Sequence, residues 1–487
     1  MLQYNLDYHM LDYIVMFVGR SAELARLREE LAAPRPSLLV VYGRRRVGKS
    51  TLLREATQAV PHVLYQATRV TAALNLDALK AEIARALGPD DLLGGLSDWL
   101  GVLTYLARAA EARPGLVVVL DEFPYLAEAE PALPSILQKF WDGGAAIPGR
   151  LNLVLCGSMI AHMEDLLAER NPLYGRKTLA MDVAPLPFRD AAAFFPSRSA
   201  EERLLAYAVF GGVPFYLQLC DPEATLEQDV TRLLLTNAGA LVDEPTVLLQ
   251  SELREVQRYA SILAAIADGC TKLGDISGRI REGGGSAGLG PYMERLERMR
   301  LVRAVRSMDA EPKSRDRRYA VADPLAAFWH RFVRPNLSSI VQGFGAEVWR
   351  HQVAPQLDGY MGGAFEEVCR EHARRHAQES LPAPAQEVGQ VWAADYDIDV
   401  AGRLLDGSMI YGECKWSRNK VGAGVLELLV SRSGRTAYGR GVSGRHFVLY
   451  ARTGFAPDLR NGDTAPASVT LHTPETMLGL AAPPKAG

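Results

Sequence analysis

The sequence predicts a protein built from several α/β domains. The chain has 487 residues, which is more than one hydrophobic core usually supports. Three short apolar runs are typical of buried strands, and polar or helix-forming residues follow each of them: 37–41 (SLLVV), 115–120 (GLVVVL) and 151–155 (LNLVL). Nearer the carboxyl end, a separate pattern of alternating charged and apolar residues begins. Together the two patterns indicate at least two α/β domains.

The composition is that of a soluble globular protein, with 48% hydrophobic and 23% charged residues. The formal net charge of −3 predicts no strong attraction of the whole protein to nucleic acid, but it is compatible with a local basic face. The scattered cysteines form no C-x-x-C pair, which argues against a disulfide framework or a zinc site (Cys156, Cys220, Cys270, Cys369 and Cys414). We find no secretory signal and no apolar run long enough to span a bilayer, so we expect a cytoplasmic protein with no membrane contact.

A phosphate-binding loop is predicted in YGRRRVGKST, residues 42–51. The loop follows an apolar run and precedes a helical pattern, and in this context backbone N–H groups and the helix N-terminus attract phosphate. Lys49 would reach the β- and γ-phosphates, and the Ser50 hydroxyl would bind Mg²⁺. The predicted nucleotide contacts are Gly43, Arg44, Arg45, Arg46, Val47, Gly48, Lys49, Ser50 and Thr51. For the three arginines, pairing with acids of the fold and contact with a nucleic acid remain alternatives.

Two further strand ends favour a nucleotide site over a chance motif. The run GLVVVLDEF ends in Asp121 and Glu122, where Asp121 would make a second Mg²⁺ contact and Glu122 would polarise the attacking water. Ser158 follows the next run and lies where a hydrogen-bonding group could sense the γ-phosphate. An ordinary strand-end turn is the alternative for Ser158.

Six segments in sequence order resemble the archaeal-type ATPases, a branch near the AAA+ and STAND NTPases: MFVGRSAEL, VYGRRRVGKSTLL, LDEFPYL, LCGSMIAHME, PLYGRK and FGGVPFYL. The resemblance covers about residues 16–340 and implies an α/β core, a helical lid and ATP as the nucleotide. It also implies that the adenine pocket is lined by Phe17, Val18, Gly19 and Arg20.

The same resemblance assigns two positions nearer the lid. Arg176 matches an arginine finger or γ-phosphate sensor, which could accelerate hydrolysis by ~10³ or more. A surface salt bridge is the alternative for this residue. Pro214 belongs to GGVP, which is similar to the STAND G-x-P element where lid and nucleotide meet; the alternative is a simple turn.

The middle of the chain predicts a winged helix, because two helical patterns precede a third that leads into a hairpin with a charged tip. Basic residues interrupted by acids could contact phosphates there (Arg295, Arg298, Arg303, Arg306, Lys313, Arg315, Arg317 and Arg318). In ATPases of this kind the winged helix often packs as an internal module, so both roles stay open.

The C-terminal pattern restarts near Gly359 and contains two strands joined around LDGS, a hairpin signal. Alternation predicts that Asp397 and Asp399 share one face of the first strand, with Ile398 and Val400 on the other. A three-residue turn, or one bulge, would set Asp399 opposite Lys415. That turn would place Asp399, Glu413 and Lys415 on one face.

An Asp…Glu-x-Lys arrangement suits a metal-dependent nuclease, since two carboxylates can hold Mg²⁺ beside a phosphate while the lysine orients or deprotonates water. FEEVC, DIDV and GECKW resemble the PD-(D/E)xK nuclease-like domain, although no proline precedes the aspartate. By that resemblance Glu366 is an accessory acid, and Asp399 is preferred to Asp397 as the metal ligand. A charged hairpin face and a nuclease fold that does not cut are the alternatives.

These observations give the expected fold class: an α/β P-loop NTPase of AAA+/STAND type with a helical lid, a winged-helix domain and a C-terminal restriction-endonuclease-like α/β domain. Expected boundaries are 1–195 for the ATPase core, 196–250 for the lid, 251–340 for the winged helix and linker, and 341–480 for the nuclease-like domain. The expected function is ATP hydrolysis whose nucleotide state controls an Mg²⁺-dependent nuclease, with Mn²⁺ as a substitute metal. Expected partners are ATP, DNA and further copies of the chain. The alternative function is a nucleotide-gated switch or a DNA-binding regulator with an inactive nuclease fold.

Overall fold

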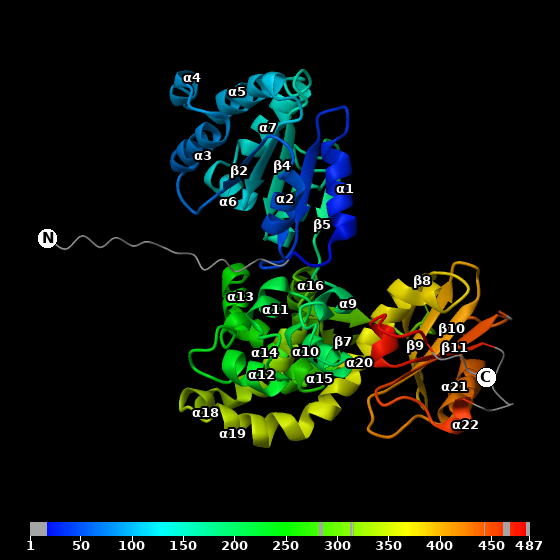
Figure 1. The fold of residues 1–487 in the computed structure, drawn as a ribbon. Helices are drawn as coiled ribbons and strands as arrows, with labels where there is room; N and C mark the ends of the chain where they lie inside the picture. The colour runs from blue at the N-terminus through cyan, green and yellow to red at the C-terminus, as the bar shows by residue number, and fades with distance from the viewer. Residues whose placement is uncertain are drawn as a thin grey trace.

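The computed structural model describes residues 17–281, 286–311, 314, 316–442, 444–460 and 468–483. It has three parts: an N-terminal α/β domain, a mainly helical middle and a C-terminal α/β domain beside that middle (Figure 1). Residues 1–16 of the expected ATPase core, and Lys313 and Arg315 of the expected hairpin tip, lie outside the described residues.

The N-terminal domain contains a five-stranded parallel sheet in the order β2-β3-β4-β1-β5. Its strands are β1 (Leu38–Tyr42), β2 (His62–Gln66), β3 (Val117–Asp121), β4 (Asn152–Gly157) and β5 (Leu179–Asp182). The three runs predicted as buried strands form β1, β3 and β4, and almost every residue in them is buried. Parallel strands buried on both faces explain these continuous apolar runs. The expected α/β P-loop NTPase-like fold is confirmed.

Helices cover both faces of this sheet. On one face, α1 (Ser21–Leu31) and α2 (Lys49–Thr57) pack against Leu39 and Val41. Against the other face pack α3 (Ala72–Leu87), α5 (Trp99–Ala112), α6 (Phe123–Ala129) and α7 (Leu133–Asp142). The short α4 (Asp91–Gly94) and α8 (Ile160–Leu166) complete the domain.

The helical middle follows β5. Its first part comprises α9 (Phe188–Ala192), α10 (Ala200–Phe210), α11 (Pro214–Leu219), α12 (Leu226–Leu234) and α13 (Glu244–Glu252). A second unit then has three helices and a hairpin: α14 (Val256–Ala267), α15 (Leu273–Ile280), η1 (Ser286–Leu289), α16 (Gly290–Arg298), β6 (Val302–Val305) and β7 (Arg318–Val321). The chain then runs through α17 (Pro324–Phe328), η2 (Trp329–Val333), η3 (Arg334–Asn336), α18 (Leu337–Val341), α19 (Gly345–Val348) and η4 (Trp349–Val353).

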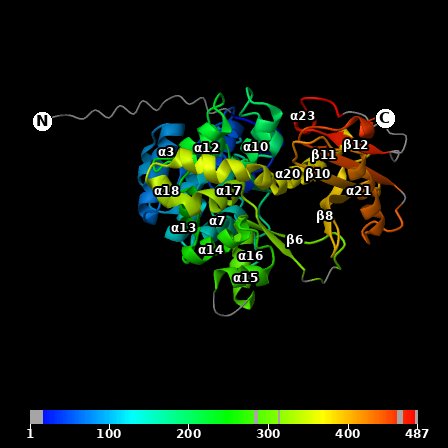
Figure 2. The ribbon, with the colours of Figure 1, turned by 90° about the horizontal axis from the view of Figure 1, so that it is seen from below.

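The β6–β7 hairpin docks on the C-terminal domain. Beyond β6, Ser307 forms a parallel bridge with Gln390, and the Ser307 hydroxyl accepts a hydrogen bond from the Trp392 N–H at 3.0 Å. Figure 2 shows β6 running toward β8 (Ala385–Trp392). The hairpin is therefore a structural link between the middle and the C-terminal domain.

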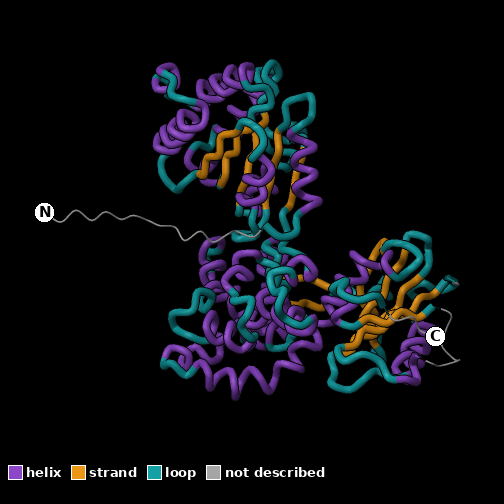
Figure 3. The backbone as a smooth tube through the Cα atoms, viewed as in Figure 1, coloured by secondary structure: helices purple, strands orange, loops and turns teal. Residues whose placement is uncertain are grey.

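The C-terminal domain has a mixed sheet in the order β12-β11-β10-β9-β8. Antiparallel pairing joins β8, β9 (Asp397–Leu404) and β10 (Met409–Lys415), whereas β10, β11 (Arg445–Ala451) and β12 (Val469–His472) are parallel. One face packs on α20 (Ala354–His376) and the other on α21 (Ala423–Arg435). Short segments complete it: η5 (Ala377–Glu379), α22 (Pro457–Arg460) and α23 (Pro474–Met477). Figure 3 shows this sheet apart from the N-terminal one.

The helix expected to start near Gly359 begins earlier, because α20 starts at Ala354 and continues through this glycine. A glycine inside a helix costs about 1 kcal/mol relative to alanine. Packing offsets that cost: the Tyr360 ring lies 5.8 Å from Phe328 and 5.5 Å from Phe332, centroid to centroid. One helix thus runs from the middle of the molecule into the C-terminal domain. Among the described residues, no helix is both long enough and apolar enough to cross a membrane.

Candidate functional site

The predicted phosphate-binding loop connects β1 to the N-terminus of α2. Gly48 caps this helix with φ 90°, and a side chain at Gly43 would place its Cβ 2.3 Å from the Val183 carbonyl oxygen. Both positions therefore require glycine. Lys49 Nζ donates to the carbonyl oxygens of Gly43 and Arg44, at 2.8 and 3.1 Å. In this structure the lysine head group is held by the loop itself.

The polar residues predicted at the strand ends meet beside this loop. The Ser50 hydroxyl donates to Asp121 Oδ2 at 2.5 Å, so the two predicted Mg²⁺ contacts are adjacent. Glu122 has a left-handed backbone conformation with φ 52°. Its carboxylate accepts from both the N–H and the hydroxyl of Ser158, at 3.3 and 2.9 Å. Ser158 therefore holds the residue predicted to polarise water.

A cavity of 390 Å³ opens next to the loop. Its walls include most of the predicted nucleotide contacts: Phe17, Val18, Arg20, Arg45, Arg46, Val47, Gly48, Lys49, Ser50, Thr51, Glu122 and Pro214. Phe194, Phe215 and Gln218 also line it, and sequence reasoning missed them. Phe215 follows Pro214 directly in GGVPFYL, so that motif could have indicated it. Phe194 had no comparable signal.

Several predicted contacts hold the walls of this cavity in place. Arg20 is buried, and its guanidinium donates to the carbonyl oxygens of Val47 and Ala184 at 2.9 and 2.6 Å. Gly19 has φ 67°, and a Cβ there would lie 2.7 Å from Asp190 Oδ2. Gly19, Gly43, Arg44 and Ser158 do not line the cavity. Their observed contacts hold the loop and its neighbours in place.

The three consecutive arginines point to three different places. Arg44 is buried and forms an ion pair with Asp323, which lies just before α17. Arg46 forms an ion pair with Glu244 at the start of α13, and its guanidinium carbon lies 4.4 Å from the Phe215 ring centroid. Arg45 lines the cavity. Two of the three thus pair with acids of the helical middle, which was one of the alternatives left open.

Tyr216 connects these two ion pairs. Its hydroxyl accepts from Arg44 Nη2 at 3.3 Å and donates to Glu244 Oε1 at 2.8 Å. The phosphate-binding loop is therefore tied to α11, α13 and the segment before α17 by one hydrogen-bonded network.

Arg176 makes a bidentate ion pair with Asp142, at 2.7 Å for both hydrogen bonds. This pairing raises the pKa of Arg176 and lowers the pKa of Asp142. Arg176 does not line the cavity beside the loop. Its observed role is that of the salt-bridge alternative.

The predicted C-terminal residues come from α20, β9 and β10, and we call Glu366, Asp399 and Glu413, with Lys415, the acidic cluster. Lys415 Nζ donates to Glu413 Oε1 at 2.7 Å. Asp399 Oδ2 accepts from the Cys414 N–H at 2.9 Å. The structure thus places near one another the four residues that the nuclease-like resemblance and the turn geometry singled out.

The strand pairing that places Asp399 in this cluster differs from the expected pairing. The loop between Leu404 and Ser408 has three residues, with Gly407 at φ 85°, as expected for a bulged turn. The pairing Gly412–Val400 shows, however, that Lys415 is not opposite Asp399. Alternation also fails: Ile398 packs on the α21 side and Val400 on the α20 side, because the β8–β9 pairing shifts register between Gly389 and Val391. The irregular strand turns Asp399 toward Cys414.

Burial and charge repulsion raise the pKa values of the carboxyl groups in this cluster. Burial raises the pKa of Asp399 to about 7, and the nearby charges of Glu366 and Glu413 add to the effect. Burial likewise raises the pKa of Glu366. For Lys415, burial opposes the charged form, but the hydrogen bond and charge of Glu413 prevail, and the pKa is raised. A site that raises the pKa of carboxyl groups favours a cation or a proton at their oxygens.

One oxygen of the cluster has no hydrogen-bond partner. Glu413 Oε2 is buried and finds none among the described residues, and Arg432 Nη1, with which it forms a long ion pair, is 3.6 Å away. Oxygen donors of this type suit Mg²⁺, which is commonly held by one or two carboxylates together with water and phosphate. Within the part of the chain that the structure describes, no group of three or more His, Cys, Asp or Glu side chains is arranged to hold a metal. Asp399 and Glu413 therefore remain the candidate pair of carboxylates, and the described residues place no third ligand beside them.

Two known families match two separate parts of the chain, one at the N-terminal α/β domain and one that reaches the C-terminal domain. Residues 17–219 match the family described as an ATPase domain predominantly from Archaea. Residues 17–219 form an archaeal-type ATPase domain. Residues 329–425 match DUF234, described as archaeal and bacterial proteins of unknown function. The second match includes α20 and the acidic cluster.

Individual proteins give further similarities. An uncharacterized protein of Methanocaldococcus jannaschii is 29% identical over 407 residues, which cover 82% of this chain and 88% of the relative. Among solved structures, the Walker-type ATPase of Pyrococcus abyssi is 21% identical, with 64% of this chain and 96% of that chain covered and a TM-score of 0.49. The Aeropyrum pernix ORC2 protein is 16% identical, with 66% and 94% covered and a TM-score of 0.42.

Proposed function

We propose that this protein hydrolyses ATP and that its nucleotide state controls a C-terminal Mg²⁺-dependent nuclease acting on DNA. The observation that carries the proposal is the acidic cluster, with its unpartnered Glu413 oxygen, in the same chain as an archaeal-type ATPase domain. The order α20, three antiparallel strands, α21 and a parallel strand supports a PD-(D/E)xK nuclease-like fold.

In the nucleotide pocket, Lys49 exchanges its two carbonyl partners for the β- and γ-phosphates of ATP. Ser50 and Asp121 would hold Mg²⁺, which supplies neutralising charge to the phosphates. Glu122 orients the attacking water once it is released from Ser158. Because Arg176 is bound to Asp142, a cation from a second copy of the chain would raise a slow basal turnover.

In the acidic cluster, Asp399 and Glu413 would hold Mg²⁺, with Mn²⁺ as a substitute. A metal held there would supply positive charge that makes a nearby water easier to deprotonate. Lys415 places a positive charge beside the phosphate and helps orient that water. Glu366 acts as an accessory acid through its negative charge on Asp399.

The ion pairs of the loop supply a route between the two sites. ATP phosphates compete with Glu244 for Arg46, which lines the pocket. The Tyr216 hydroxyl couples Glu244 to Arg44 and so to its ion pair with Asp323. Asp323 also caps α17, and Phe328 at the end of α17 packs on Tyr360 of α20. The helix α20 carries Glu366 into the acidic cluster. Nucleotide binding thus acts on the C-terminal site through α17 and α20.

Tyr216→Phe tests this route, because it removes the hydroxyl that joins Arg44 to Glu244 and keeps the ring. ATP hydrolysis should persist while the effect of ATP on DNA cleavage is lost. Tyr174→Phe, at an exposed tyrosine, is the control. If Tyr216→Phe keeps the full ATP effect, the route is wrong.

The three helices and hairpin of the middle are proposed to form a winged helix that works as an internal module. Its basic residues pair within the chain: Arg298 with Glu164, Arg300 with Asp182 and Arg303 with Glu367. Such pairing favours the internal role over contact with a duplex.

A second candidate function is a nucleotide-gated switch with an inactive nuclease fold. The ion pair between Lys415 and Glu413, with Arg432 nearby, favours it, since cations of the protein already balance part of the acidic charge.

Cleavage of plasmid and single-stranded DNA with Mg²⁺ or Mn²⁺ separates the two functions. Glu413→Gln keeps the shape of the side chain and removes its charge, so it should abolish cutting and leave ATP hydrolysis unchanged. Glu427→Gln, an exposed residue on α21, should cut as the wild type does. No cutting by any protein, with ATP hydrolysis intact, would support the switch instead.

A further inference from the structure

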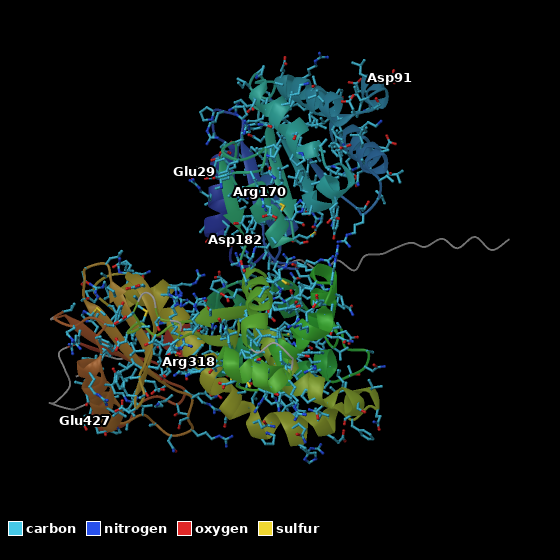
Figure 4. All side chains as sticks on the ribbon, turned by 180° about the vertical axis from the view of Figure 1, so that it is seen from behind. Glu29, Asp91, Arg170, Asp182, Arg318 and Glu427 are labelled. Carbon is cyan, nitrogen blue, oxygen red and sulfur yellow. The ribbon has the colours of Figure 1, made fainter. Side chains whose placement is uncertain are left out.

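A second and larger cavity lies between the three parts of the molecule. It has a volume of 1050 Å³ and is walled by the chain before α9, the β6–β7 hairpin, residues 360–375 of α20 and strand β8. Arg318, on this hairpin, lies at the junction between the middle and the C-terminal domain (Figure 4). The cavity is separate from the pocket beside the phosphate-binding loop, and neither family match assigns it a ligand.

The walls of this cavity carry more basic than acidic side chains, although the whole chain is slightly acidic. Arginine side chains outnumber carboxylates there by seven to four: Arg44, Arg300, Arg303, Arg318, Arg370, Arg374 and Arg375 against Asp323, Glu366, Glu367 and Glu371. Positive charge concentrated in a low-dielectric recess attracts polyanions more strongly than the same charge spread over a surface.

Part of this positive charge is not used within the protein. Arg303 pairs with Glu367 at 3.0 Å, yet its buried Nε finds no hydrogen-bond partner among the described residues. Burial is the main reason that the pKa of Arg303 is lowered. Arg374 is exposed on α20. This buried N–H is therefore available to an acceptor from a ligand or from water.

An aromatic ring accompanies these arginines. The Arg318 guanidinium carbon lies 4.3 Å from the ring centroid of Trp392, and the indole Nε1–H of Trp392 donates to Asp316 Oδ2 at 3.1 Å. Proteins that bind single-stranded nucleic acid combine a basic groove for the backbone with aromatic side chains and arginines against which bases stack.

The cavity also leads to the acidic cluster. Glu366 lines it, and the Arg370 Nη1 that lies 3.5 Å from Glu366 also donates to the carbonyl oxygen of Asp399 at 2.9 Å. A polyanion that follows the arginines toward this end therefore arrives beside Asp399 and Glu413.

We propose that this cavity binds a single strand of nucleic acid, with phosphates at Arg303, Arg318 and Arg374, and delivers it past Glu366 to the acidic cluster. The volume is at the upper end for small-molecule sites, which suits a few nucleotides and excludes a duplex. The inference rests on the proposed nuclease only for what happens to the strand after it binds.

The test measures binding of a fluorescein-labelled oligothymidylate by anisotropy, without metal, in the Glu413→Gln background so that the probe is not consumed. Arg374→Ala and Arg318→Ala should each weaken binding about three- to tenfold. Each should also reduce the slope of log K against log salt by about 0.7, as expected when one phosphate contact to a single strand is lost. Arg108→Ala, at an exposed arginine of α5, is the control and should bind as its parent does. ATP hydrolysis by each variant shows that it is folded.

Three outcomes would overturn the proposal: unchanged binding in both Arg374→Ala and Arg318→Ala, equal loss in Arg108→Ala, or equally good competition by a duplex of the same length. Failure of the proposed nuclease gives a different result. In that case, wild type never cuts, but binding still depends on Arg374 and Arg318. Cutting that requires Glu413, together with arginine-independent binding, would remove this inference alone.

Discussion

The nucleotide pocket and the acidic cluster are built in opposite ways. The pocket is formed largely by one loop of consecutive residues at the N-terminus of α2, and its Lys49 is bound to backbone oxygens. The acidic cluster is assembled from α20, β9 and β10, and its Lys415 is bound to a carboxylate that a metal would need. Both lysines must therefore change partners before their sites can work, but Lys49 gives up neutral carbonyl oxygens whereas Lys415 gives up a charged carboxylate.

The largest expected effect tests the pocket side of this comparison. Lys49→Ala should lower the ATP hydrolysis rate on the order of 10²-fold or more, because it removes a positive charge from the transferring phosphate. Steady-state phosphate release measures this rate. Arg54→Ala, at an exposed residue of the same helix, should match the wild type. An equal fall in both variants would mean that the helix, and not the phosphate contact, was disturbed.

The link between the two regions should carry measurable stability. Asp323→Asn leaves Arg44 buried without its counter-charge, and breaking a buried ion pair in this way costs about 3–5 kcal/mol. Urea unfolding of the isolated protein measures the loss. Asp243→Asn, at an exposed position, should change stability by less than about 0.5 kcal/mol. A similar stability for wild type and Asp323→Asn would mean that Arg44 does not depend on this carboxylate.

In the C-terminal domain, His472 should make the free energy of unfolding depend on pH. Burial lowers the pKa of His472 from 6.5 to about 4, so the unfolded state takes up this proton first as the pH falls. The stabilisation is complete above pH 6.5 and is lost as the pH falls from there toward 4. Between pH 7 and pH 5 the loss is about 2 kcal/mol.

Urea unfolding at these two pH values, with His472→Gln as the comparison, isolates this contribution. The wild type should lose about 2 kcal/mol more than the variant. The raised pKa of Asp399 makes the folded state more stable as the pH falls, which opposes the effect of His472. Asp399 is present in both proteins, so its contribution cancels in the comparison. Equal pH dependence in the two proteins would show that His472 is not the group responsible.

The smallest effect is expected at Arg176. Because its guanidinium is committed to Asp142 at the surface, Arg176→Ala should leave the ATP hydrolysis rate of dilute protein within about twofold of wild type. Phosphate release measured over a range of protein concentrations checks this. A large loss at every concentration would instead assign Arg176 to the nucleotide site of its own chain.

The difference between a pocket formed by one loop and a cluster assembled from distant elements also explains what could be predicted from the sequence. Strands β1, β3 and β4 and the loop at 43–51 were predictable, since each is a continuous segment whose pattern can be recognised without knowing its distant partners. The partners of Arg44 and Arg46 were not, because Asp323 and Glu244 lie 279 and 198 residues further along the chain. The register of β9 was missed because it depends on its irregular pairing with β8, which no local turn signal encodes.

The central claim is that nucleotide in the N-terminal pocket governs chemistry at the acidic cluster. Its most direct test measures plasmid cleavage with Mg²⁺ while ATP or a non-hydrolysable analogue is titrated, in wild type and in Lys49→Ala. The account predicts that nucleotide changes the cleavage rate of the wild type and has no effect on Lys49→Ala. Cleavage that requires Glu413 but proceeds at one rate with and without nucleotide would contradict it.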